Sequence, residues 1–509
     1  MPSIVTDFEQ RLHALPQATL QRLNRGIEKE SLRVRPDGAL ATTPHPKMLG
    51  SALTHPHITT DFSESQLELI TGVHGSAAAC LAELTSIHQA VYRAIGDELL
   101  WCASMPCGLP ADNAIPLGQY GTSNVGRAKT VYRTGLSYRY GRRMQAISGI
   151  HYNFSLPEPQ SNDAYFALIR NFRRHSWLLL YLFGASPAVC SSFVAGRPHE
   201  LQTLGDGTRY LPYATSLRMG RLGYQSDAQS SLKVSYNNLD SYAASLQEAL
   251  TRPYRPYEDI GIRDGDNYRQ LATSLLQIEN EFYGTIRPKR VIRPGERPLH
   301  ALRERGVEYV EVRLMDLDPF CPIGITAGTL LFLDIYLLNC LLRHSPPDSP
   351  QELEVVVRNK RRVAERGREP GLLLTRGARE VMLVDWGSEV LAECAPIAAA
   401  LDAANGGSAH RDALASAVAR LNNAATTPSA RVLDAMARDY DNSFVRFVLA
   451  QSLAHRETLL ALPFADDDAQ RHARLAAESL ATQGDIEAAD TLPFETFRQN
   501  YLSPASLNV

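Results

Sequence analysis

The sequence predicts an α+β fold, in which a curved antiparallel sheet has one packed face and one polar face and helices pack outside it. Segments in the first two thirds of the chain alternate apolar and polar residues with period two, as strands of a half-buried antiparallel sheet do. From about residue 346 the chain becomes rich in Ala, Arg and Glu at helical spacing. We therefore predict a domain built on this sheet with flanking helices over residues 1–345, and a mostly helical C-terminal region over residues 346–509 that packs on it.

Size, charge and hydropathy argue against several classes of protein. Apolar residues make up 44% and charged residues 21% of the 509 positions, which is ordinary for a globular protein. A net charge of −3 gives no electrostatic footprint for nucleic acid or an anionic membrane. The most membrane-like run, at 177–196, ends in Ser, Pro, Cys and Gly, so we expect a buried helix that runs into a loop. The N-terminus predicts an amphipathic helix rather than a signal peptide, which favours a cytoplasmic protein.

The cysteines form no recognisable metal or redox motif. Seven are present, and only Cys102 and Cys107 are close in sequence. Their spacing matches no zinc signature. We expect reduced thiols, as is usual in the cytosol, and no cysteine nucleophile.

The alternating segments carry polar residues that are uncommon on a solvent-exposed sheet face. In GIEKESLRV, residues 26–34, two glutamates share a face with Leu32 and Val34, where burial is expected. The segments SQLELIT, MQAISGIHYNFSLP and VEYVEVRLMD repeat the pattern, and LLQIENEFY, residues 275–283, is predicted as a further strand of this kind. A solvated sheet face explains any one of these segments, but a concave sheet lined by a polar active site explains them together.

Carboxylates gathered on such a face need positive charge nearby. Like charges a few ångströms apart repel, and burial removes their hydration, so an unpaired cluster is heavily penalised. Hard oxygen ligands suit Mg²⁺ or Mn²⁺, which bind through a few carboxylates together with substrate phosphates. Arg313, two residues from Glu311 on the same face, suits bidentate contact with a phosphate. His151 is either a nitrogen ligand or a hydrogen-bonded core residue.

The residues alone therefore predict a metal-rich site that handles phosphate. The sequence has neither a P-loop nor a G-x-G-x-x-G motif after a strand, so ATP, if it binds, is held through metals and a sheet. A metal-dependent phosphatase or hydrolase fits this pattern as well as a phosphoryl-transfer enzyme does.

A series of short stretches, taken in order, resembles one family. The stretches are GIEKESLRV, LGSALTHPHITTDFSESQLELIT, SMPCGL, QYGTSNVGRAKTVYR, MQAISGIHYNFSLP, YLFGASPAVCSSF, YLPYATSLRMGRLGY, LLQIENEFYGTIRPKR, GVEYVEVRLMDLDPFCPIG and a later NGG. Together they resemble the proteobacterial type of glutamate–cysteine ligase (γ-glutamylcysteine synthetase). The resemblance implies a glutamine-synthetase-like fold, whose curved sheet forms a funnel with ATP and divalent metals at one end and the amino acids at the other.

The resemblance also implies a reaction and the residues that carry it. ATP phosphorylates the γ-carboxylate of glutamate, and the amine of cysteine then expels phosphate to give γ-glutamylcysteine, the first step of glutathione biosynthesis. The implied ligands of Mg²⁺ or Mn²⁺ are Glu28, Glu30, Asp61, Glu68, His151 and Glu311. The implied catalytic residues are Arg313, at the transferring phosphoryl group, and Arg133. The implied cysteine-binding residues are Leu136, Gln145, Arg218, Tyr224 and Tyr283.

Two rival functions stay open at this point. A ligase that joins glutamate to another amine or to ammonia would keep the carboxylates and Arg313 but change the cysteine pocket. A catalytically inactive metal-binding homologue would lack at least one metal carboxylate, and none is missing. We expect L-glutamate, L-cysteine and ATP as the partners of a monomer, with neither nucleic acid nor membrane.

Overall fold

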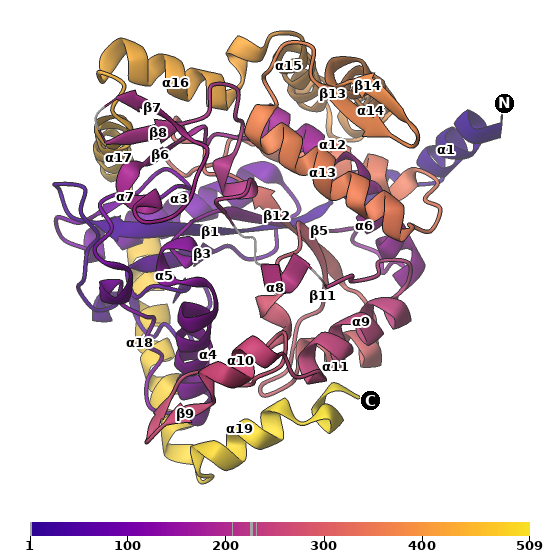
Figure 1. The fold of residues 1–509 in the computed structure, drawn as a ribbon. Coiled ribbons are helices and arrows are strands. Elements are labelled where there is room, and N and C mark those ends of the chain that lie inside the picture. The colour runs from indigo at the N-terminus through magenta and orange to yellow at the C-terminus, as the bar shows by residue number, and fades with distance from the viewer. Residues whose placement is uncertain (1–2, 206, 224–226, 231, 509) are drawn as a thin grey trace.

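The computed structural model describes residues 3–205, 207–223, 227–230 and 232–508. At its centre is a seven-stranded antiparallel sheet in the order β11–β12–β5–β1–β3–β2, with β4 paired to the end of β1 (Figure 1). Its strands are β1 (Asn24–Val34), β2 (Ile58–Thr60), β3 (Gln66–Ile70), β4 (Leu99–Leu100), β5 (Ile150–Ser155), β11 (Ile286–Lys289) and β12 (Tyr309–Met315). Smaller antiparallel pairings join β6 (Ala188–Cys190), β7 (Gln202–Gly205) and β8 (Thr208–Tyr210), β9 (Arg263–Asp264) and β10 (Asn267–Tyr268), and β13 (Leu373–Arg376) and β14 (Arg379–Met382).

Helices surround this sheet, which agrees with the predicted α+β class (Figure 1). Up to residue 345 they are α1 (Ser3–His13), α2 (Gln17–Gln21), α3 (Ala77–Ala94), α4 (Asn124–Tyr140), α5 (Arg142–Gln145), α6 (Asn162–Phe183), α7 (Ser191–Val194), α8 (Asp227–Ser230), α9 (Leu239–Thr251), α10 (Arg255–Ile260), α11 (Pro298–Arg305) and α12 (Ala327–Leu342). Beyond it they are α13 (Pro350–Arg366), α14 (Leu383–Asn405), α15 (Ala409–Asn422), α16 (Pro428–Asp439), α17 (Phe444–Ala461), α18 (Asp466–Ala489) and α19 (Phe494–Leu502).

One face of the sheet packs against α3, α6 and α12. The alternation of β5 and β12 places Tyr152, Phe154, Val310 and Val312 on this face, and all are buried in the main hydrophobic cluster. α3 contacts β1 and β3, α6 contacts β11 and β12, and α12 packs on both helices. Side chains alternate along a strand, so the polar residues between these apolar ones lie on the opposite face of the sheet. A cavity lies against that face.

The far end of β1 passes from the cavity into a second hydrophobic cluster. Leu32 and Val34 are fully buried there with Trp101 and Phe444. The prediction that these two residues lie in core is confirmed, and the two glutamates before them line a cavity on the polar face of the sheet.

Two predictions of regular structure were wrong. LLQIENEFY contains no strand, and its centre is a short 3-10 helix, Glu279–Glu281. There the alternating acids have structural partners: Glu279 accepts both Nε and Nη2 of Arg297, at 3.0 and 2.7 Å, and Glu281 accepts from Arg139 at 2.8 Å. The first residues of MQAISGIHYNFSLP are likewise the end of α5, and the strand begins only at Ile150.

The apolar run at 177–196 is the buried second half of α6 followed by a loop and β6, as predicted. Among the described residues, no helix is both long and apolar enough to cross a membrane. The expectation of uniformly reduced thiols was wrong, because Cys107 and Cys190 form a disulfide with their Cα atoms 5.3 Å apart.

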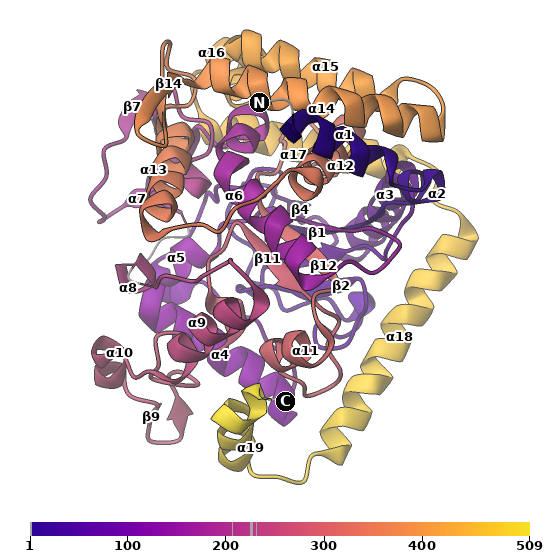
Figure 2. The same cartoon turned by 90° about the vertical axis from the view of Figure 1, so that its right-hand side faces the viewer.

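The C-terminal region is helical apart from the β13–β14 hairpin, and it surrounds the rest of the molecule. α14 packs on α12 and α2, α17 packs on α3, and α19 packs on α4. In Figure 2 the long helix α18 runs down one side of the molecule and ends near α19. The division at residue 345 stays a prediction.

Candidate active site

A single cavity of about 430 Å³ contains every predicted site residue that the structure describes. It lies against the polar face of the sheet and under α4, and its described predicted residues are Glu28, Glu30, Asp61, Glu68, Arg133, Leu136, Gln145, His151, Arg218, Tyr283, Glu311 and Arg313. Tyr224 lies outside the described residues. Residues from seven separate stretches of sequence therefore meet at one place.

The centre of the cavity is built from neighbouring positions on β1, β5 and β12. Glu28 is the register partner of His151, and Glu311 is the register partner of Asn153. His151 Nδ1 lies 3.0 Å from Glu28 Oε2, and the Asn153 side-chain amide donates to Glu28 Oε1 at 2.9 Å. Ligand atoms of Glu28, His151 and Glu311 all lie within 4.8 Å of one another.

A second group of carboxylates lies beside this centre. Glu30 and Glu68 are register partners on β1 and β3, and Asp61 directly follows β2. Glu30 accepts a hydrogen bond from the Gly149 backbone N–H at 2.7 Å, and its other oxygen lies 3.5 Å from His151 Nε2. His151 thus stands between the two groups of carboxylates.

Two cations balance part of this negative charge. Arg313 donates to Glu311 Oε2 at 3.0 Å, and Lys289 donates to Glu311 Oε1 at 3.2 Å. Burial alone would raise the pKa of Glu311, but these two cations outweigh it and hold that pKa well below its usual range. Burial and the charge of Glu311 also act to raise the pKa of Glu28, but the His151 hydrogen bond helps to lower it to about 2.

The other carboxylates are less well compensated. Burial raises the pKa of Glu68 well above its usual value, and the charges of Glu28 and Asp61 add to the shift. Burial and the charge of Asp61 likewise raise the pKa of Glu30. The sheet therefore concentrates more negative charge at this end than its own arginines and lysines neutralise.

This donor set fits a divalent cation of the Mg²⁺ or Mn²⁺ type. The donors are carboxylate oxygens with one imidazole, which is the ligand chemistry that these hard ions accept. Three donors already lie close enough together to contact one ion, and they line a cavity large enough to admit phosphate as well.

The remaining predicted residues form the wall next to α5 and the short 3-10 helix Leu217–Met219. The Gln145 side-chain amide donates to the Tyr283 hydroxyl at 2.5 Å, and Leu136 is buried on α4. Arg218 is also almost fully buried, and it donates to the Arg313 carbonyl at 2.9 Å. A Cβ at Gly149 would collide with the Arg218 guanidinium, so a larger residue there would require Arg218 to move.

Arg133 is directed toward backbone rather than toward a carboxylate. It donates to the carbonyl of Asp61 and lies over the Tyr120 ring, with its guanidinium carbon 4.4 Å from the ring centroid. The residue thereby fixes the loop that carries Asp61, at the edge of the cavity.

Sequence reasoning missed several cavity residues. Arg287 and Lys289 alternate on β11, and Glu311 is the register partner of Arg287, so their period-two spacing was an available signal. Lys360, Phe497 and Tyr501 come from the helical C-terminal region and carried no signal, because nothing in their local sequence relates them to the sheet.

Comparison with known proteins agrees with this geometry. The family model described as glutamate-cysteine ligase matches residues 10–363. Curated glutamate–cysteine ligases from Alcanivorax borkumensis and Pseudomonas entomophila are each 48% identical to the chain; the first match covers 97% of this chain and 99% of that protein, and the second covers 97% of both. A crystal structure of glutamate–cysteine ligase from Francisella tularensis in complex with AMP superposes with a TM-score of 0.90 at 36% identity, covering 95% of this chain and 98% of that one.

The similarity extends over nearly the full length of both the sequence relatives and the solved structure. It includes the helical C-terminal region as well as the sheet with its carboxylates. The chain belongs to the glutamate–cysteine ligase family.

Proposed function

We propose that the protein joins the γ-carboxylate of L-glutamate to the amino group of L-cysteine, with ATP converted to ADP and phosphate. The observation that carries the proposal is the convergence of all twelve described site residues on one cavity, in a chain of this family. The reaction needs ATP because a carboxylate is a poor electrophile and its oxygen is a poor leaving group. Phosphorylation of the γ-carboxylate removes both obstacles.

The cationic side chains act on the transferring phosphoryl group. Arg313 is held by Glu311 on a rigid strand, so its guanidinium is oriented before substrate arrives. A fixed cation stabilises the charge that spreads over the phosphoryl oxygens without reorganising during the reaction. We assign Arg133 a supporting role, since it holds the Asp61 loop at the same cavity.

Glu28, Glu30, Asp61, Glu68, His151 and Glu311 are the proposed ligands of Mg²⁺ or Mn²⁺. When bound, the metal ions supply positive charge to the phosphate oxygens. The raised pKa of Glu68 and the crowding of Glu28, His151 and Glu311 support this assignment. Asn153 orients Glu28 by donating to the oxygen that His151 does not contact.

The acceptor pocket is assigned to Leu136, Gln145, Arg218, Tyr224 and Tyr283. Gln145 and Tyr283 are joined by a hydrogen bond, and the Tyr140 ring lies with its centroid 5.6 Å from that of Tyr283. A leucine and packed aromatic rings suit the small, weakly polar side chain of cysteine. We also propose that the protein works in the cytoplasm as a monomer.

The test is ADP release by the purified protein with ATP, Mg²⁺ and glutamate, in three reactions containing cysteine, ammonia or no acceptor. Mass detection identifies the product. We expect turnover that requires cysteine and yields γ-glutamylcysteine. Equal turnover with ammonia would reject the acceptor pocket, and turnover without any acceptor would favour a phosphatase or hydrolase. A chain inactive under all three conditions would instead be the metal-binding homologue.

A further inference from the structure

The helix α13 brings a cation without an assigned role into the active-site cavity. Lys360 lines the cavity together with Arg218 and Met219. Among the described cavity residues beyond residue 345, it is the only charged one, since the others are Phe497 and Tyr501. A lysine of the C-terminal region thus lines the same cavity as the residues of the proposed acceptor pocket.

The second half of α13 is attached to the segment that carries Arg218. The backbone N–H groups of Thr215 and Ser216 both donate to the Ala364 carbonyl, at 2.9 and 3.1 Å. The Thr215 hydroxyl also donates to the Val363 carbonyl at 3.0 Å. Lys360 lies one helical turn before these contacts on the same face of α13, and it lines the cavity together with Met219.

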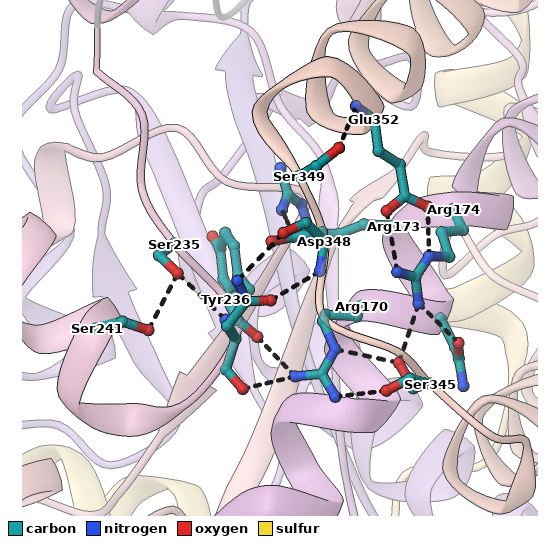
Figure 3. Close-up of polar contacts among 12 residues, drawn as sticks. Arg170, Arg173, Arg174, Ser235, Tyr236, Ser241, Ser345, Asp348, Ser349 and Glu352 are labelled. Carbon is teal, nitrogen blue, oxygen red and sulfur yellow. Dashed lines mark hydrogen bonds and ion pairs between the residues drawn. The ribbon is translucent and has the colours of Figure 1, made fainter. Parts of the chain in front are cut away.

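The first turn of α13 and the segment just before it are held by arginines of α6 (Figure 3). Arg174 donates to both carboxylate oxygens of Glu352, at 2.6 and 3.0 Å. Arg173 contacts Asp348 at 3.3 Å, and Arg170 donates to the carbonyl and the hydroxyl of Ser345 at 2.9 and 3.2 Å. Bidentate and charge-assisted contacts of this kind fix geometry, so the backbone that carries Lys360 is anchored at both ends.

Lys360 has no counter-ion within the described part of the chain. No hydrogen bond or ion pair joins its ammonium group to any residue that the structure describes. Burial, together with the positive charge of Arg173, lowers the pKa of Lys360 to about 8. A half-buried cation of this kind is stabilised by an anion, and the cavity that it lines is where substrate anions enter.

Arg218 lies on the 3-10 helix that packs against α13, and contacts within the protein hold it in place. It donates to the Arg313 carbonyl, and its Nη1 lies 3.9 Å from the carboxylate of the buried Asp316. A carboxylate has two oxygens, so a substrate carboxylate in this cavity can accept from Lys360 through one oxygen and from a second donor through the other.

We propose that Lys360 binds the α-carboxylate of the acceptor amino acid and thereby makes the enzyme select an amino acid over a simple amine. The inference rests on the proposed function, because it assumes that cysteine is the acceptor. The location favours the acceptor: Arg313 and most of the metal carboxylates lie on strands of the sheet, whereas Lys360 lies on α13, which packs on the 3-10 helix Leu217–Met219 that carries Arg218. The α-carboxylate of glutamate is the alternative that the experiment must separate.

The experiment compares full-length wild type, Lys360→Met and Lys360→Arg in steady-state ADP release. Lys233→Met is the matched control. Lys233 is 65% exposed, and its Nζ lies 3.8 Å from the carboxylate of Glu354, which belongs to α13 as Lys360 does. Each protein is assayed with cysteine and with cysteamine, which is cysteine without its carboxylate. Cysteamine is also tested as an inhibitor competing with cysteine, and so is 3-mercaptopropionate, which keeps the carboxylate but lacks the amine.

We expect Lys360→Met to raise the KM for cysteine and the Ki of 3-mercaptopropionate by about 10- to 100-fold, the usual effect of losing a hydrogen bond to a charged group. The KM or Ki of cysteamine, the KM for ATP and the KM for glutamate should stay within about twofold of wild type. Lys360→Arg should recover most of the cysteine affinity, and Lys233→Met should match wild type.

Three results would overturn the inference. Equal losses with cysteine and cysteamine would mean that Lys360 acts through structure, and a selective rise in the KM for glutamate would assign it to the donor substrate. An unchanged KM for cysteine in Lys360→Met would also reject it. Failure of the proposed function is distinguishable, because it shows in wild type as absence of γ-glutamylcysteine before any variant is compared.

Discussion

Glu28 is the residue at which the proposed metal chemistry is most directly tested. Glu28→Gln keeps the size of the side chain but removes its charge from the group formed with His151 and Glu311. We expect kcat to fall by about 100-fold or more, because a metal ligand that positions charge at the phosphoryl group is lost. The measurement is steady-state ADP release at saturating substrates over a range of Mg²⁺ concentrations.

Glu248→Gln is the control for this variant, since Glu248 is 68% exposed on α9 and pairs with the next-turn Arg252 at the surface. Circular dichroism should show both variants folded. Normal turnover of Glu28→Gln would remove Glu28 from the proposed ligands.

Arg218 lines the proposed acceptor pocket and also holds the Arg313 carbonyl, and these two roles affect different kinetic parameters. Arg218→Ala opens the acceptor wall, so the KM for cysteine should rise about tenfold or more while the KM for ATP changes far less. The same change frees the Arg313 carbonyl, so kcat should fall as well. Arg221→Ala, on the same segment and 53% exposed, should leave both parameters unchanged. An equal rise in the two KM values would place Arg218 outside the acceptor pocket.

Among single residues, the sequence predicted those that look unusual within their own strand. Glu28, His151 and Glu311 alternate with buried residues on strands, and a carboxylate in such a position is anomalous enough to be noticed. Lys360 could not be found in this way, because a lysine on an amphipathic helix is ordinary. Only its tertiary position, next to a segment almost 150 residues earlier in the chain, gives it a possible function.

At the scale of elements, one buried ion pair joins the sheet to the helix behind it. Asp334 on α12 accepts from Arg25 on β1 at 2.8 Å and from the Tyr152 hydroxyl on β5 at 2.5 Å. Asp334→Asn removes the charge that compensates Arg25, and breaking such a pair from one side typically costs about 3–5 kcal/mol. We expect a clearly lower thermal unfolding transition, measured by calorimetry or circular dichroism.

Activity should separate this structural role from a catalytic one. Asp334 lies on the helix side of the sheet and does not line the cavity, so kcat per folded molecule should remain near that of wild type. Asp259→Asn, 69% exposed on α10, is the stability control. An unchanged transition in Asp334→Asn would show that the pair contributes no net stability.

Elements were predictable where alternation reflects a packed face, and not where it arises from other partners. β5 and β12 alternate because one side packs against α6 and α12. The segment around Glu279 and Glu281 alternates for a different reason, because each acid has an arginine partner, Arg297 for Glu279 and Arg139 of α4 for Glu281. Period two by itself does not distinguish these two causes.

At the scale of the whole molecule, the catalytic sheet and the C-terminal helices share one core. The main hydrophobic cluster contains residues of α6 and α12 together with residues of α14 and α15. The rings of Trp177 on α6 and Trp386 on α14 lie with their centroids 5.0 Å apart. The change in composition near residue 346 was visible in the sequence, but which surfaces the later helices cover was not, since amphipathic spacing identifies a buried face without its partner.

This shared core predicts that the two parts of the chain do not fold separately. Expressed alone, residues 1–345 would expose the apolar surface of α6 and α12 that α14 covers, and they would lose Phe497 and Tyr501 from the cavity. We expect this fragment, and likewise 346–509, to aggregate or to unfold without a cooperative transition, because exposed apolar patches of this extent promote association.

Size-exclusion chromatography and thermal unfolding of each fragment, alone and after co-expression, are the measurements. Co-expression should recover soluble complex if the shared core is what each part lacks. A monomeric 1–345 fragment with a cooperative transition near that of the full chain would instead show that the sheet and its helices form an independent domain, to which the C-terminal helices are only attached.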